Sequence, residues 1–148
     1  MRGWSDAEVD GRPGPEACGT VARNASQMSA PVWIGVAILG SLGSLARFLL
    51  DGAVSARRSP SFPYGTLAVN GSGALILGLL TGLALSGEAF TLAGSATIGS
   101  YTTFSTWMLE THRLGEDGQL LAGLLNVLMS VAVGLAAALL GRTIGGAL

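Results

Sequence analysis

The sequence has few charged residues and no lysine. Only 11% of its 148 residues are charged and all eight basic residues are arginines, whereas soluble domains carry roughly 25% charged residues. With a net charge of −1, the chain lacks the basic surface that binds nucleic acid. Hydrophobic residues make up 49% of the chain and the mean hydropathy is +0.55, so a soluble fold would have too little polar surface. The composition predicts an integral membrane protein.

Cysteine and histidine each occur once. Cys18 has no second cysteine for an intramolecular disulfide, and His112 has no second ligand for a metal site. The apolar segments contain neither a Ser-His-Asp nor a Cys-His set, and no pair of carboxylates lies inside them. Nucleophilic and acid–base catalysis require such groups. The sequence therefore predicts that the protein is not an enzyme.

Residues 1–30 differ in composition from the remainder. They hold seven charged residues, Pro13 and Pro15, and no apolar run, which excludes a secretory signal peptide and favours a disordered tail. Met28 immediately precedes the first apolar segment, so translation from that residue is an alternative. Residues 31–148 form the expected folded domain.

The folded domain contains four apolar segments of membrane-spanning length, which is about 20 residues. Short polar connections separate them, and such connections make successive helices antiparallel neighbours. Small residues recur at four-residue steps in the second and fourth segments, as in closely packed membrane helices. The sequence predicts an all-α bundle with both termini on one side, His112 in a polar loop at 111–118, and a flexible glycine-containing end. The expected helices are 31–50, 65–86, 89–110 and 119–141.

The third apolar segment contains the most unusual stretch, GSYTTFSTWMLE at residues 99–110. It has five serine and threonine hydroxyls, a glycine at its start and a carboxylate at its end. A glycine followed by hydroxyl-bearing and β-branched residues favours a break in the helix. Non-helical backbone at membrane depth is tolerated only where it is buried in protein or lines a wet cavity. We therefore predict that the third helix is broken in mid-span and forms the functional centre.

Two other polar residues lie in apolar segments, and each has two interpretations. Asn70 either holds two helices together by a hydrogen bond or donates to an ion, because an amide in lipid needs a polar partner. Arg47 is near the end of the first segment, where its side chain either extends to the membrane surface or faces the protein interior as a cation. The residues alone favour the hydrogen bond for Asn70 and the membrane surface for Arg47.

Three classes of function are compatible with a small four-helix membrane protein. A multidrug or cation transporter needs a carboxylate deep in a helix, whereas Asp51, Glu88 and Glu110 lie at segment ends. A non-conducting structural subunit accounts for the glycines but not for the hydroxyl-rich break. An ion channel fits better, since amide, hydroxyl and arginine donors and aromatic ring edges suit an anion. Arginines are nearly balanced between the two sides, so the positive-inside rule gives almost no preferred orientation.

Three stretches resemble the signature motifs of the small bacterial fluoride channels, the Fluc or CrcB family. Residues 40–48 (GSLGSLARF) resemble the first-helix pattern of two glycines followed by arginine and an aromatic. Residues 65–78 (GTLAVNGSGALILG) resemble the second-helix pattern and residues 99–110 the third, with Trp107 in place of the usual phenylalanine. The resemblance covers the chain after about residue 32.

The resemblance implies an antiparallel, dual-topology dimer with two fluoride pathways along the subunit interface. Asn70 matches the pore asparagine, and Phe104 and Trp107 match the aromatic pair whose ring edges face the ion. Residues at i and i+3 share a helix face, so the spacing agrees. The indole N–H of Trp107 is a further expected donor, although its larger ring narrows the path.

The resemblance also assigns other site residues and a cofactor. It implies a structural sodium ion at the dimer centre, bound by the backbone carbonyls of Gly99 and Thr102. The further residues expected along the fluoride pathway are Arg47, Thr103, Ser105, Glu110 and Ser130. For Arg47 this raises the interior position above the membrane surface.

The implied function is passive, selective export of toxic fluoride across the bacterial inner membrane. Fluoride enters acidified cells as neutral HF and is trapped as the anion in the more alkaline cytoplasm, so it leaves down its electrochemical gradient. The expected partners are fluoride, the lipid bilayer, and a second copy of the chain or a paralogous subunit, with no nucleic acid.

Overall fold

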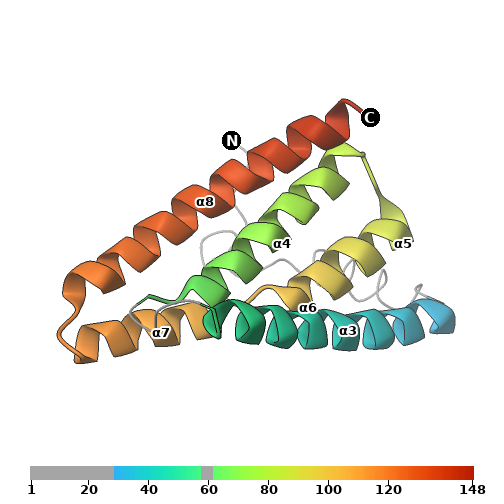
Figure 1. Cartoon of the computed structure of the whole chain (residues 1–148). Helices are drawn as coiled ribbons and strands as arrows, with labels where there is room; N and C mark the ends of the chain where they lie inside the picture. Colours follow the sequence, from blue (N-terminus) through green and yellow to red (C-terminus); the bar gives the residue numbers. More distant parts are fainter. Residues whose placement is uncertain (1–28, 58–61) are drawn as a thin grey trace, which may run out of the picture. The chain divides into compact units, whose positions relative to one another are not determined.

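The computed structural model describes residues 29–57 and 62–148, which form only helices and their connections (Figure 1). The chain divides into the units Met1–Ile34 and Gly35–Leu148, and all contacts given below lie within the second. The expected tail up to residue 28, with Cys18 and Met28, lies outside the described residues. The helices are α3 Ala30–Ser55, α4 Tyr64–Gly82, α5 Gly87–Phe90, the π-helix η1 Thr91–Ile98, α6 Gly99–Tyr101, α7 Ser105–Glu116 and α8 Leu120–Gly146.

Three of these helices, α3, α4 and α8, are long and apolar enough to cross a membrane. The remaining apolar segment runs from α5 to α7 and is interrupted, so none of its helices reaches that length. In the described part of the chain the largest side chains that are almost completely buried are those of Val69, Asn126 and Thr66, whereas most leucines along α3 and α8 are more than half exposed. Lipid or another subunit must cover such apolar faces. The chain is therefore a multi-pass, all-α membrane protein.

Four helix ends differ from the sequence expectation. Helix α4 ends at Gly82 instead of 86. Helix α3 continues to Ser55 instead of ending at 50, so Asp51 is helical. Helix α7 continues to Glu116 where a polar loop from 111 was expected. His112 Nδ1 lies 3.3 Å from Glu116 Oε2 on the exposed face of this helix, a spacing of four residues that stabilises helices. Polarity marked the end of the apolar segment correctly but did not end the helix.

The fourth helix was expected to end at 141 with flexible glycines, but α8 extends to Gly146. Packing explains this extension. A Cβ atom at Gly141 would collide with the carbonyl oxygen of Leu75, and one at Gly145 with that of Leu79. The glycines therefore allow the backbones of α4 and α8 to touch, as small residues do between membrane helices.

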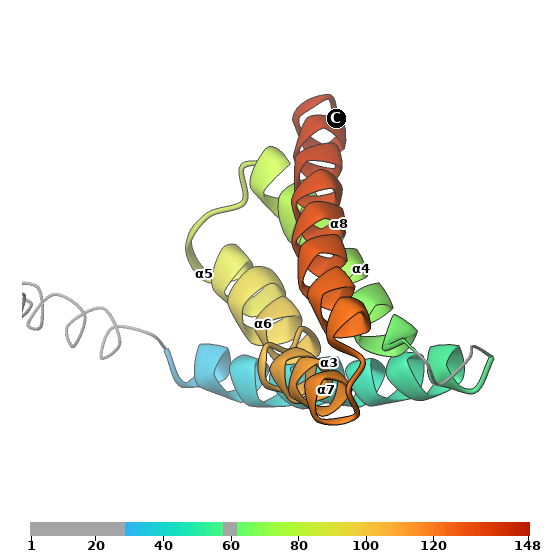
Figure 2. The same cartoon turned by 90° about the vertical axis from the view of Figure 1, so that its left-hand side faces the viewer.

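Helices α4 and α8 lie side by side along most of their length (Figures 1 and 2). Their contacts advance together, from Leu75 with Gly141 to Leu79 with Gly145, so the two helices run parallel. Gly78 in turn faces the backbone of Ala138. This parallel course is expected for the second and fourth spans of a chain that crosses the membrane four times.

Candidate functional site

The third span is broken between α6 and α7. Thr102 N–H makes the last helical bond, to Ile98 O at 3.0 Å. The backbone of Thr102 is then extended, with φ −77° and ψ 160°, and α7 begins three residues later at Ser105. The predicted mid-span break is therefore confirmed.

Asn70 on α4 binds the broken backbone with both ends of its side-chain amide. Its Nδ2 donates to Thr103 O at 2.8 Å, and Thr103 N–H donates to Asn70 Oδ1 at 2.8 Å. A helix break leaves backbone groups without helical partners, and such groups are costly away from water. Asn70 supplies these partners, so the expected interhelical hydrogen bond is present and serves the break itself.

The side chain of Thr103 begins the next helix. Thr106 N–H donates to Thr103 Oγ1 at 3.2 Å, which is how a capping threonine satisfies a free amide at a helix N-terminus. Thr103 Oγ1 also lies 3.0 Å from Thr106 Oγ1 and 3.5 Å from Ser105 Oγ. The hydroxyls in this stretch therefore compensate much of the polarity that the break exposes.

A glycine allows α4 to approach the break. A Cβ atom at Gly73 would collide with Thr102 Cγ2 and would lie 3.3 Å from the ring of Tyr101. The Tyr101 hydroxyl lies 2.7 Å from Ser72 Oγ on the same helix. Gly73 and Asn70 are three residues apart and thus share one helix face, which is the face of α4 that holds the break.

A groove of about 550 Å³ lies beside the break. Phe104 is 71% exposed, and its ring meets that of Trp107 edge to face, with centroids 5.6 Å apart and an interplanar angle of 72°. An amide has two N–H donors, and among the described residues Asn70 Nδ2 bonds only to Thr103 O. The groove thus combines aromatic edges with one donor still available. Its lining comprises Asn70, Gly73, Ala74, Leu77, Phe90, Gly94, Ser95, Ile98, Gly99, Thr102, Thr103, Phe104 and Trp107.

The indole N–H of Trp107 points to α8 and not into free space. Trp107 Nε1 donates to Asn126 O at 3.4 Å. The fully buried Asn126 side chain donates to Thr111 Oγ1 at 2.8 Å, and Thr111 Oγ1 donates to Trp107 O at 2.8 Å. This ring of contacts fixes α7 against α8 and holds the Trp107 ring beside the groove.

Two backbone carbonyls at the break are candidates for a cation. The two amides that would pair with Gly99 O in a continuous helix bond elsewhere, since Thr103 N–H binds Asn70 and Thr102 N–H binds Ile98. Across the described residues, neither Gly99 O nor Thr102 O accepts a hydrogen bond. A Cβ atom at Gly99 would meet only open space, so its backbone is accessible from outside the subunit.

The structure brings together some of the expected site residues and separates others. Gly99, Thr102 and Thr103 line the groove with Asn70 and the aromatic pair, whereas four expected residues do not. Ser130 Oγ donates to Asn126 Oδ1 at 3.5 Å, and Ser105 is exposed next to Thr103. Arg47 and Glu110 are half-buried at other positions. In the part of the chain that the structure describes, Arg47 Nε is buried without a hydrogen-bond partner.

Sequence reasoning missed Asn126 as the residue that supports Trp107. A buried amide in an apolar helix requires partners, so its presence in the fourth segment was a usable signal. The distance in sequence hid the partner, since Thr111 lies in another helix. The π-helix η1 was also missed. Within it, Thr97 Oγ1 donates to Leu92 O, five residues earlier, at 2.8 Å. Such wide turns often occur near functional sites.

These features define a small multi-pass membrane protein with a groove at a helix break, of the kind that handles ions. Residues 34–142 match the family model described as CrcB-like protein, Camphor Resistance (CrcB). The chain belongs to this CrcB-like family.

Curated relatives carry a more specific name. The chain is 61% identical over 111 residues to Fluoride-specific ion channel FluC 2 of Mycolicibacterium paratuberculosis, covering 75% of this chain and 91% of the relative. It is 56% identical over 117 residues to the protein of the same name from Mycobacterium bovis, covering 79% and 93%. It is 39% identical over 119 residues to Fluoride-specific ion channel FluC 1 of Symbiobacterium thermophilum, covering 76% and 96%.

Proposed function

We propose that the protein is a fluoride-selective passive ion channel that exports fluoride from the cytoplasm across the bacterial inner membrane. The observation that carries this proposal is the groove, in which Asn70, Phe104 and Trp107 converge on a broken helix. The names of the curated relatives support the choice of ion. Conduction down the electrochemical gradient needs no energy source, and the groove residues supply only positioning and electrostatics.

Fluoride is small and strongly hydrated, so a pathway must replace the water that it loses. The remaining N–H of Asn70 and the positive ring edges of Phe104 and Trp107 suit this purpose. The bond from Trp107 Nε1 to Asn126 makes the indole N–H unavailable, so Trp107 contributes its ring edge in this proposal. The residues expected on the pathway that do not line the groove are Arg47, Ser105, Ser130 and Glu110, and we propose that they act along the pathway outside it.

The groove is open on one subunit, and we propose that a second copy of the chain closes it as an antiparallel dimer. Phe104 at the groove is 71% exposed in a single subunit, and a second subunit would cover its ring. The nearly balanced arginines permit both insertion orientations. A paralogous subunit could replace the second copy, and the oligomer recovered from cells expressing this chain alone would distinguish the two arrangements.

We also propose that the dimer holds one structural sodium ion. Carbonyl oxygens are suitable ligands for a hard cation, and Gly99 O and Thr102 O have no hydrogen bond in the described part of the chain. Gly99 faces open space, where an antiparallel partner would bring the same two carbonyls. Sodium would there satisfy backbone groups that the break leaves unpaired.

The test is fluoride efflux from liposomes that hold the purified protein, followed with a fluoride electrode against a chloride control. We expect fast fluoride release without chloride release. Phe104→Ile removes the ring edge and should abolish flux while the dimer remains intact. Phe48→Ile is the matched control, because Phe48 is 75% exposed on α3 and outside the groove.

The alternatives make different predictions in the same assay. A structural subunit would give no flux, and its variants would change assembly instead. A multidrug or cation transporter would tolerate Phe104→Ile and depend on Glu110. Absence of fluoride release from folded dimers would contradict the homodimeric channel and direct the test to a paired subunit.

A further inference from the structure

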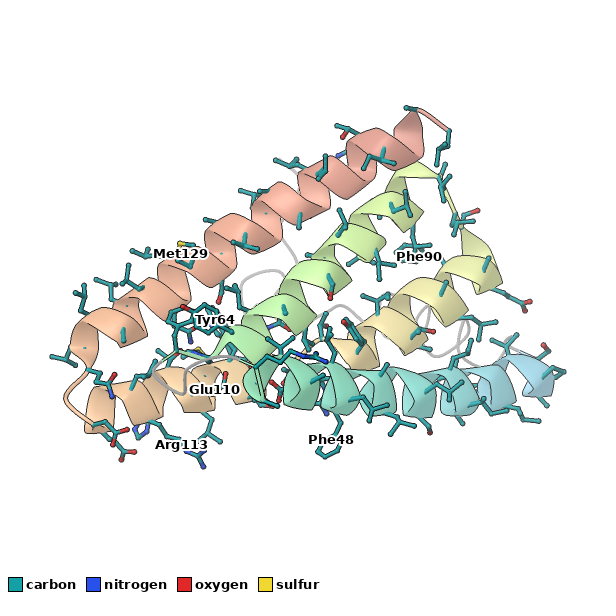
Figure 3. All side chains as sticks on the ribbon, in the orientation of Figure 1. Phe48, Tyr64, Phe90, Glu110, Arg113 and Met129 are labelled. Carbon is teal, nitrogen blue, oxygen red and sulfur yellow. The ribbon has the colours of Figure 1, made fainter. Side chains whose placement is uncertain are left out.

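The groove extends from the helix break along η1 to α5. Four of its lining residues come from this part of the third span, namely Phe90, Gly94, Ser95 and Ile98. Phe90 lies on the side of α5 that faces α4 (Figure 3). Of the four, only Ser95 has a polar side chain, so it is the hydroxyl that this part of the groove contains.

The hydroxyl of Ser95 has no partner among the described residues. A serine in a helix commonly bonds the backbone carbonyl three or four residues earlier. Ser41, Ser72 and Ser100 do so, at 2.7, 2.7 and 2.9 Å. Ser95 is exposed and, within the described ranges, forms no hydrogen bond. A hydroxyl without a partner is costly in an apolar span, so the environment outside this subunit must supply one.

The wide turn of η1 helps to leave this hydroxyl unpaired. The carbonyl three residues before Ser95 is that of Leu92, and it accepts a bond from Thr97 Oγ1 at 2.8 Å. Thr97 lies five residues after Leu92, a spacing that belongs to a π-helix. Thr97 therefore competes with Ser95 for the carbonyl that a helical serine would use.

We propose that Ser95 is a further residue of the fluoride pathway, whose hydroxyl donates a hydrogen bond to the ion. This inference rests on the proposed function and extends the pathway along η1. Ser95 precedes Thr102 by seven residues, which at 1.5 Å per residue places it roughly 10 Å along the span from the break. A strongly hydrated anion needs a new donor at each step of its path. The remaining N–H of Asn70 serves the break, and Ser95 serves the part of the groove toward α5.

The test is the fluoride current through single channels of the purified full chain in planar lipid bilayers. This current does not depend on how many dimers fold, so a purely structural role of Ser95 would leave it unchanged. Ser95→Ala should reduce it by about tenfold, as expected for loss of a hydrogen bond to a charged group. Ser95→Thr keeps the hydroxyl and should retain most of the current.

Two further variants test whether the donor itself matters. Ser95→Cys keeps the approximate size but donates only weakly, so its current should lie between those of Ser95→Ala and the unaltered chain. Ser44→Ala is the matched control. Ser44 on α3 also lacks a hydrogen bond among the described residues, but it does not line the groove. Its removal should leave the current unchanged.

Three results would overturn the proposal. The first is an equal single-channel current in Ser95→Ala and Ser44→Ala. The second is a loss in Ser95→Thr as large as that in Ser95→Ala, since side-chain shape would then matter and not the hydroxyl. The third is an unchanged current with less dimer in size-exclusion chromatography of Ser95→Ala, because the hydroxyl would then pair with the second subunit. In all three cases the unaltered chain still conducts, whereas absence of its fluoride current would overturn the proposed function as well.

Discussion

The hydrogen bonds of Asn70 make a strong prediction about stability. Replacing Asn70 by leucine retains the approximate volume but leaves Thr103 N–H and Thr103 O without partners. Each unpaired buried backbone group costs about 1–3 kcal/mol, whereas interhelical hydrogen bonds in membranes contribute about 0.6 kcal/mol on average. We therefore expect Asn70→Leu to lower the free energy of unfolding by about 2–4 kcal/mol.

The measurement is unfolding of the purified protein by SDS in mixed micelles, followed by circular dichroism. Thr81→Val is the matched control on the same helix, since Thr81 Oγ1 donates to Gly78 O within α4. Asn70→Asp separates the two bonds, because a carboxylate still accepts from Thr103 N–H but repels Thr103 O. Its stability should lie between those of Asn70→Leu and the unaltered chain.

The result that would refute the reasoning is equal stability of Asn70→Leu and Thr81→Val. The break would then not depend on the amide, and Asn70 would serve only the ion. Loss of fluoride flux in Asn70→Leu at unchanged stability would support that conclusion. Loss of both is expected if the same amide holds the break and faces the groove.

Further predictions concern packing around the site. Gly141→Ala places a Cβ atom against the backbone of α4 and should destabilise the protein by about 1–3 kcal/mol. Gly134→Ala on the same helix meets open space, so it should leave stability unchanged or raise it in the same SDS titration. Equal effects of the two substitutions would contradict the parallel contact of α4 and α8. Gly73→Ala forces Thr102 to move and should reduce fluoride flux more than it reduces stability. Liposome efflux measures the flux and SDS unfolding the stability. Unchanged flux would show that the groove tolerates the movement of Thr102. Asn126→Leu removes the bond to Thr111 and should cost about 1–2 kcal/mol, and unaltered stability would argue against its role in supporting Trp107.

Several features of the fold could be predicted from the sequence because they depend on local composition. Apolar segments of sufficient length predict spans, and glycine followed by hydroxyl-bearing residues predicts the break that Thr102 shows. Helix ends were less predictable. A polar residue such as Asp51 or His112 stops neither backbone hydrogen bonding nor helix growth, so α3 and α7 continue past the apolar segments.

The candidate site was only partly predictable for a different reason. The motif identified Asn70, Phe104 and Trp107 as a group, but it could not show that Asn70 binds Thr103 or that the Trp107 indole N–H binds Asn126. These partners lie 33 and 19 residues apart in sequence. Such pairings depend on which helix faces meet, and that is a property of packing.

The sequence by itself determined the membrane location, the all-helical class, the interrupted third span and the family. These follow from hydropathy, residue conformational preferences and motif spacing, all of which act over a few neighbouring residues. Only the tertiary structure decided which groups of the described residues are left unpaired, namely the carbonyls at the break and the second N–H of Asn70. Whether a polar group is unpaired depends on every residue near it in space, and those residues come from helices that lie far apart in the sequence.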